Sequence, residues 1–273
     1  MTNAHETTSQ LFNKLKSSQR PYVITGSRAS VQYHRWLSPA PQIVELRIYP
    51  EDYGYWMNLL QGEAIYVSET PPTTEMMKGL EMGVLLSKKL DAQIYQNNRA
   101  FAGLHYESPE DLCIDFLAGL VTETPVMEFL AILLMQRQTF QWEYFCQKAT
   151  ASGLAREAGI LLEVINEHTQ QNLMPQSVIE QLFQGTVKND DLMDGYFPHT
   201  WRVRLALRRK NERDLTITYP RTSRRWGVKV VLPRYIMDKL VLDLDYAWRN
   251  QFSDINSAFE DKPAVTNSVL LDS

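Results

Sequence analysis

The chain has 273 residues, of which 44% are hydrophobic and 22% are charged, and its formal net charge is −4. These values are ordinary for a globular protein with one large domain or two modest ones. The longest uninterrupted apolar run, Phe129–Met135, is far too short to span a membrane, and the polar residues 1–9 lack the apolar stretch of a secretory signal. We therefore expect a cytoplasmic protein with no membrane partner.

Well-known metal and catalytic motifs are missing from the sequence. Paired CxxC cysteines, HExxH, a Walker lysine loop, GxGxxG and GxSxG are all absent. The two cysteines, Cys113 and Cys146, lie in apolar segments with helical periodicity, which favours reduced, buried thiols over a disulfide or a nucleophile.

The first third of the chain is organised around the unit Pro21–Asp52. Before it, residues 1–10 are expected to be loose and residues 10–18 to form a short amphipathic helix. The unit itself reads as a strand at Tyr22–Thr25, a Gly-Ser turn, a short helix, a Pro-rich breaker and a second strand at Ile43–Tyr49. In the second strand, polar and apolar residues alternate, so one face should be polar and the other apolar.

The next elements are shorter. Pro50, Glu51 and Asp52 are typical of a helix start, and residues 63–68, 83–86, 93–96 and 100–104 have the composition of short strands. Asp91 is the acidic residue that precedes the run 93–96. From its local surroundings, after Lys88 and Lys89, it is interpreted as a turn residue.

Helical periodicity dominates the middle of the chain. Ser108 followed by Pro109 and Asp111 is typical of a capped helix start. Four further helices are expected at 124–137, 139–152, 154–168 and 175–183, and the short loops between them favour antiparallel packing in a bundle.

After residue 195 the pattern changes to strands. Residues 201–208, 214–219 and 227–232 alternate or are β-rich, residues 235–250 have a helical pattern, and residues 261–273 form a loose tail. The sequence thus predicts an α+β fold with four regions: an α/β region at 1–107, a helical bundle at 108–194, a basic β-hairpin plus helix at 195–260, and the tail.

Positive charge is concentrated in one segment. Residues 202–234 hold eleven Lys or Arg residues and two acids, a balance of +9, so the rest of the chain carries −13. A segment this basic usually faces phosphate or an acidic surface. Arginines interleaved with aromatic residues suit phosphate contacts and base stacking. The residues expected to bind nucleic acid are Arg202, Arg204, Arg208, Arg209, Lys210, Arg221, Arg224, Arg225, Trp226 and Lys229. There are two alternatives. In the first, the segment docks on acidic residues of the same chain or of a partner protein, and in the second, it forms a solvated face of a hairpin.

The unit at 21–52 resembles the opening of the nucleotidyltransferase fold, in which a Gly-Ser pair follows the first strand and two carboxylates on the second strand hold magnesium. Gly26-Ser27 matches the first feature. At the carboxylate pair the chain reads Glu45-Leu46-Arg47, so a guanidinium stands where the second carboxylate belongs. A fixed positive charge repels a divalent ion. The resemblance is to AbiE-type proteins of abortive-infection and toxin–antitoxin systems, in which "SPEDL", "QWEYF" and "GLAREAGILLEVI" helices also recur.

Three functions are compatible with these observations. The first is a non-catalytic, nucleotidyltransferase-like protein that binds nucleic acid in regulation, defence or a toxin–antitoxin pair, without a catalytic residue, metal or cofactor. The second is an active nucleotidyltransferase, in which Gly26 and Ser27 cradle a triphosphate and Glu45 and Asp91, the latter at the position of the family's third carboxylate, hold magnesium; Arg47 argues against it. The candidate nucleotide-binding residues implied by the resemblance are Gly26, Ser27, Glu45, Arg47 and Asp91. The third is a structural subunit whose basic segment docks on an acidic partner protein.

Overall fold

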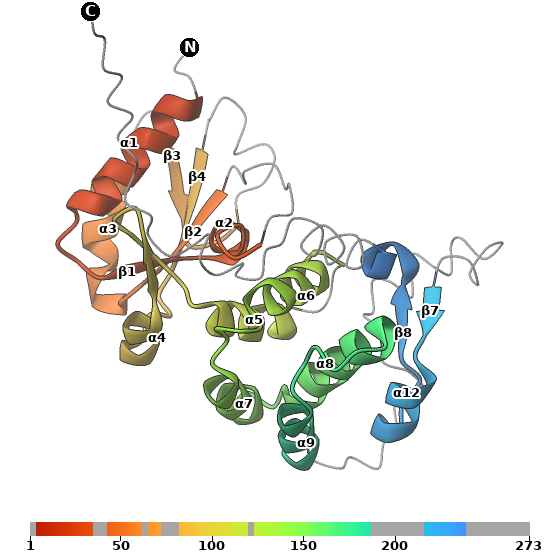
Figure 1. The fold of residues 1–273 in the computed structure, drawn as a ribbon. Helices are drawn as coiled ribbons and strands as arrows, with labels where there is room; N and C mark the ends of the chain where they lie inside the picture. The colour runs from red at the N-terminus through yellow and green to blue at the C-terminus, as the bar shows by residue number, and fades with distance from the viewer. Residues whose placement is uncertain are drawn as a thin grey trace, which may run out of the picture.

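The computed structural model describes residues 4–34, 43–61, 65–71, 82–119, 123–186 and 216–238. The fold is α+β, as the sequence predicts (Figure 1). A six-stranded mixed sheet has the order β3-β4-β2-β1-β6-β5, in which β1 is antiparallel to β2 and parallel to β6. Its strands are β1 (Tyr22–Thr25), β2 (Ile43–Ile48), β3 (Ile65–Ser68), β4 (Met82–Ser87), β5 (Arg99–Phe101) and β6 (Leu104–Tyr106).

Helices cover both faces of this sheet. α1 (Ala4–Ser17) and α3 (Tyr53–Leu60), which follows the short turn η1 (Pro50–Asp52), pack on the side of Leu46 and Ile48. α2 (Gly26–Ser30) and α5 (Pro109–Ala118) lie on the other side, next to Arg47. The expected alternation of β2 is confirmed, because Leu46 and Ile48 are fully buried. The polar side is not open to solvent, since α5 covers it.

Three local expectations are wrong. Residues 93–96 belong to a helix, α4 (Ala92–Asn97), because Asp91 caps it by accepting a hydrogen bond from the backbone N–H of Ile94 at 2.8 Å. Residues 100–104 are not one strand, because Ala102 and Gly103 form a turn with φ values of 49° and 76° between the end of β5 and the start of β6. Residues 4–10 are helical, since α1 begins at Ala4.

The helical region follows the predicted order. It contains α5, α6 (Glu123–Gln136), α7 (Trp142–Ala151), α8 (Ala155–Thr169) and α9 (Gln176–Gln184). The cap of α5 is confirmed, because the Ser108 hydroxyl accepts from the Asp111 N–H at 3.1 Å. Cys113 and Cys146 are buried and unpaired, as expected. Among the residues that the structure describes, no helix combines the length and the apolar character needed to cross a bilayer.

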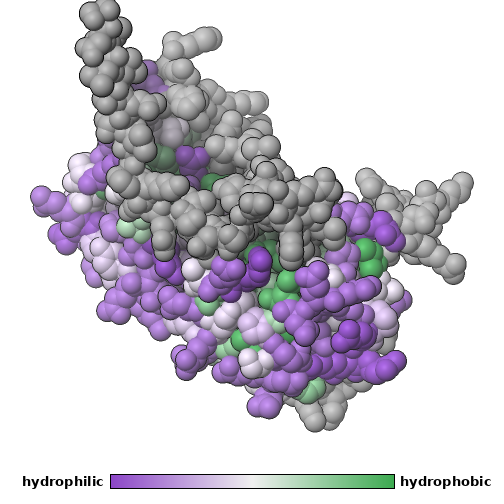
Figure 2. Space-filling model, in the orientation of Figure 1, coloured by the Kyte–Doolittle hydropathy of each residue, from purple (hydrophilic) through white to green (hydrophobic). Residues whose placement is uncertain are grey.

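The basic segment folds against this helical region. β7 (Thr216–Thr218) pairs antiparallel with β8 (Val231–Pro233), in the order expected but with shorter bounds. The connection between them is a helix, α12 (Pro220–Trp226), which lies beside α8 (Figure 1). Hydrophilic side chains dominate the surface around α8, α9 and α12 (Figure 2). The expected strand at 201–208, the tail at 261–273 and most of the helix at 235–250 lie outside the described residues.

Candidate functional site

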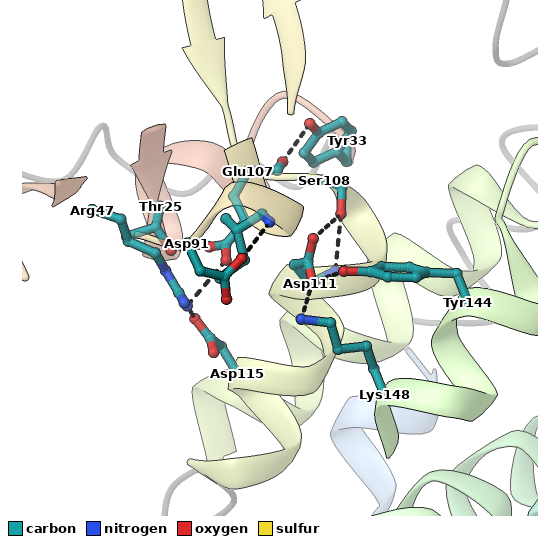
Figure 3. A network of polar contacts seen from close by, with 11 residues as sticks. Thr25, Tyr33, Arg47, Asp91, Glu107, Ser108, Asp111, Asp115, Tyr144 and Lys148 are labelled. Atoms are coloured by element: carbon teal, nitrogen blue, oxygen red, sulfur yellow. Dashed lines mark hydrogen bonds and ion pairs between the residues drawn. The ribbon is translucent and has the colours of Figure 1, made fainter. Parts of the chain in front are cut away.

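Arg47 is held between carboxylates from distant parts of the chain (Figure 3). Its Nη2 atom lies 3.0 Å from Oε1 of Glu107, and it also forms an ion pair and hydrogen bond with Asp115 on α5. Thr25, at the end of β1, donates its hydroxyl to the other oxygen of Glu107. The guanidinium therefore joins β2 to α5 and neutralises acids around it.

Glu107 is fully buried at the junction between β6 and α5. Burial raises the pKa of its carboxyl to about 7, although Arg47 and the Thr25 hydroxyl act in the opposite direction. Oε1 is within ion-pair distance of Arg47 but has no aligned hydrogen bond. Because a buried carboxylate without full hydrogen bonding is costly, Glu107 is poised between its charged and neutral forms near neutral pH.

The Gly-Ser turn is closed by Glu45. Gly26 has a φ of 63°, and a Cβ built on it would lie 2.8 Å from both Cδ and Oε1 of Glu45. The carboxyl therefore packs directly on the turn, and partial burial raises its pKa. The Ser27 hydroxyl donates to Glu128 on α6 at 3.3 Å. The structure thus brings Gly26, Ser27, Glu45 and Arg47 together, with an acid occupying the space over the glycine.

Asp91 has a local structural role. Its carboxylate caps α4, which agrees with the interpretation of it as a turn residue. Among the described ranges, no group of three or more His, Cys, Asp or Glu side chains is arranged to hold a metal ion. Around Arg47, the carboxylates of Glu107 and Asp115 are engaged in ion pairs with the guanidinium.

The sequence did not reveal several members of the polar network in Figure 3. Asp111 accepts hydrogen bonds from Tyr144 at 2.7 Å and from Ser108 at 2.8 Å, and Lys148 lies 3.7 Å from it. The capping pattern singled out Ser108 and Asp111, but nothing local to Glu107 or Asp115 signals that either pairs with a strand more than fifty residues earlier.

The described part of the basic segment divides its cations between two environments. Arg221, Arg224, Lys229 and Arg234 are exposed. Arg225 faces inward, where it pairs with Glu163 of α8 at 3.5 Å and with Glu180 of α9 at 2.7 Å. The other expected contact residues, Arg202, Arg204, Arg208, Arg209 and Lys210, lie outside the described residues.

Trp226 is not available for base stacking, so this part of the expectation is wrong. Its side chain is buried, its Nε1–H donates to Glu163 at 2.6 Å, and its ring lies edge-on to Phe183 with 5.0 Å between centroids. Trp226 and Thr222 are four residues apart on α12, and both face α8 because a helix aligns positions i and i+4. Tyr219 is buried as well.

Comparisons with known proteins returned no match among protein-family models, curated proteins or solved structures.

Proposed function

We propose that this chain is a non-catalytic, nucleotidyltransferase-like protein that binds nucleic acid through an exposed basic surface formed by Arg221, Arg224 and Lys229. The proposal is supported mainly by the difference between Arg225, which is engaged in ion pairs with α8 and α9, and the exposed cations of the same segment. Arg225 docks α12 on the helical region, whereas Arg221 and Arg224 are exposed on that helix and Lys229 is exposed in the connection from α12 to β8. A role in regulation, defence or a toxin–antitoxin pair follows from the resemblance.

The non-catalytic part of the proposal is supported by the surroundings of Arg47. The strand, Gly-Ser turn, helix and strand order on which the resemblance is based is present in β1, α2 and β2. Arg47 is fixed by two carboxylates, and Glu45 lies against Gly26. A two-metal transfer site needs carboxylates that are free to bind cations. Magnesium is a cofactor only in the catalytic alternative.

An incorporation assay tests whether the chain transfers nucleotides. Labelled nucleoside triphosphates with magnesium or manganese, offered with RNA and protein acceptors, should leave no label on either acceptor. Incorporation that is lost in Glu45→Ala would establish the active nucleotidyltransferase in its place.

The binding part of the proposal rests on electrostatics. With Trp226 and Tyr219 buried, two aromatic rings of the basic segment cannot stack on bases, so recognition should depend mainly on phosphates and carry little base preference. Phosphate binding releases condensed counterions, so affinity should fall steeply with salt. If Arg221, Arg224 and Lys229 each contact one phosphate of a duplex, they should contribute roughly −3 to the slope of log affinity against log salt.

A salt titration of filter binding tests this surface. The double variant Arg224→Ala/Lys229→Ala should flatten the slope by about two, since each lost phosphate contact lowers it by nearly one. The matched control is Lys16→Ala/Lys89→Ala, which removes the same charge from exposed positions on the sheet region and should leave the slope unchanged. If neither DNA nor RNA binds the purified chain at low salt, the proposal fails. Salt-sensitive capture of an acidic protein by the same residues would then favour the assembly subunit.

A further inference from the structure

The helix that presents two of the exposed arginines is capped from outside. α12 has only seven residues, and the side chain of its N-cap residue, Tyr219, does not cap it, because the Tyr219 hydroxyl lies 3.2 Å from Nδ1 of His168 instead. Such a short helix does not persist alone, because nucleation costs more than a few hydrogen bonds return. Glu167 of α8 supplies the missing cap. Its carboxylate accepts from the backbone N–H groups of Arg221 at 3.0 Å and Thr222 at 2.8 Å, and from the Thr222 hydroxyl at 2.7 Å.

The opposite end of α12 is fixed to the same face of α8. Glu163, one helical turn before Glu167, accepts from the Trp226 indole and pairs with Arg225. Two carboxylates at positions i and i+4 of α8 therefore hold the first and last turns of α12. Arg221 and Arg224, at positions i and i+3, are both exposed and share the outward side of the helix.

We propose that Glu167 is a positioning residue for the polyanion-binding surface, an inference that rests on the proposed function. By ordering the first turn of α12, Glu167 holds Arg221 and Arg224 at a fixed spacing before a polyanion arrives. A loose loop of the same charge would have to be ordered during binding, and that cost would be subtracted from the affinity. Glu167 thus raises affinity for phosphates although it carries a negative charge itself.

If Glu167 acts only through its charge, its removal should raise the affinity for a polyanion. If it acts by positioning α12, its removal should lower that affinity. Glu167→Ala separates the two, and its expected result is weaker binding.

The experiment measures filter binding of a mixed-sequence DNA duplex and an RNA duplex at fixed low salt, followed by a salt titration. Glu167→Ala should weaken binding by about threefold to tenfold, in line with the loss of a helix cap. The salt slope should stay unchanged, because no cation is lost.

Three comparison variants separate the cap from the charge. Glu167→Gln should recover part of the affinity, since its amide oxygen still accepts hydrogen bonds from α12. Thr222→Val, which changes no charge, should weaken binding by a smaller factor. The control Glu143→Ala removes one exposed acid from α7 and leaves both ends of α12 held by α8, and it should bind as tightly as the wild type or more tightly.

Amide hydrogen exchange supplies the second measurement. In Glu167→Ala, exchange should accelerate in α12 while α9 remains protected. Binding that is unchanged or tighter in Glu167→Ala, or exchange in α12 that does not change, would overturn the inference. If Glu167→Ala fails to fold, Thr222→Val decides by the same criteria. If the wild type binds neither duplex, the proposed function fails and this inference with it, whereas binding by the wild type with normal affinity in both variants refutes the inference alone.

Discussion

The contact between Gly159 and Trp226 gives a sharp test of how α12 is docked. Gly159 lies in the middle of α8, where replacement of glycine by alanine ordinarily stabilises a helix by about 0.8–1.0 kcal/mol. Here a Cβ would lie 2.5 Å from Cζ2 of Trp226 and closer still to Cη2, far inside van der Waals contact. The indole must therefore move by about 1 Å if alanine is introduced.

The indole has little room to move. Its Nε1 is bonded to Glu163, and Phe183 lies against it. Overpacking of this kind costs about 1–3 kcal/mol, and complete ejection of the ring costs about 3–5 kcal/mol, as in a Trp→Ala change. After subtraction of about 1 kcal/mol gained in helix propensity, Gly159→Ala should destabilise the chain by up to about 2 kcal/mol if the ring only shifts and by about 2–4 kcal/mol if it is expelled.

Urea unfolding followed by tryptophan fluorescence measures this change. Gly54→Ala in α3 is the matched control, because a Cβ there has no atom within 4 Å and should stabilise the chain by up to about 1 kcal/mol. In a Trp226→Ala background, Gly159→Ala should no longer be destabilising, since the clash has been removed. An unfolding midpoint of Gly159→Ala at or above that of the wild type would refute the close packing of α12 on α8.

Three further predictions concern the interior. Because burial raises the pKa of Glu107 from 4.5 to about 7, its contribution to stability is present below pH 4.5 and is lost as the pH rises to about 7. Unfolding free energies at pH 5 and pH 8 should therefore show the wild type gaining up to about 3 kcal/mol over Glu107→Gln at the lower pH, and identical pH profiles would contradict this. Ser108→Ala should cost about 1 kcal/mol, and an unchanged denaturant midpoint would mean that the cap contributes nothing. Cys113→Ser and Cys146→Ser should each cost roughly 1–3 kcal/mol by burying an unsatisfied hydroxyl, whereas rapid labelling of both thiols in the native chain would show that they are exposed.

Local sequence signals determined many of the elements. β1 and the start of β2 follow from β-rich runs, α2 from the Gly-Ser turn, and α5 from Ser108 and the proline after it. In each case the deciding interactions lie within a few residues. The error at residues 93–96 arose because a short run without a decisive period was assigned from composition, although Asp91 before it is a typical N-cap residue. The cap of α12 could not be found in this way, because Glu167 lies more than fifty residues before the N–H groups that it binds.

Only the tertiary structure decided which charged side chains are paired and which are exposed. From the sequence, Arg47 is a cation at a position where a carboxylate is expected, and residues 202–234 are a block of positive charge. The fold brings Glu107 and Asp115 to Arg47, and it brings Glu163 and Glu180 to Arg225, while Arg224 is left at the surface. The adjacent residues Arg224 and Arg225 therefore have different roles, because the carboxylates that bind Arg225 lie on helices more than forty residues earlier in the chain.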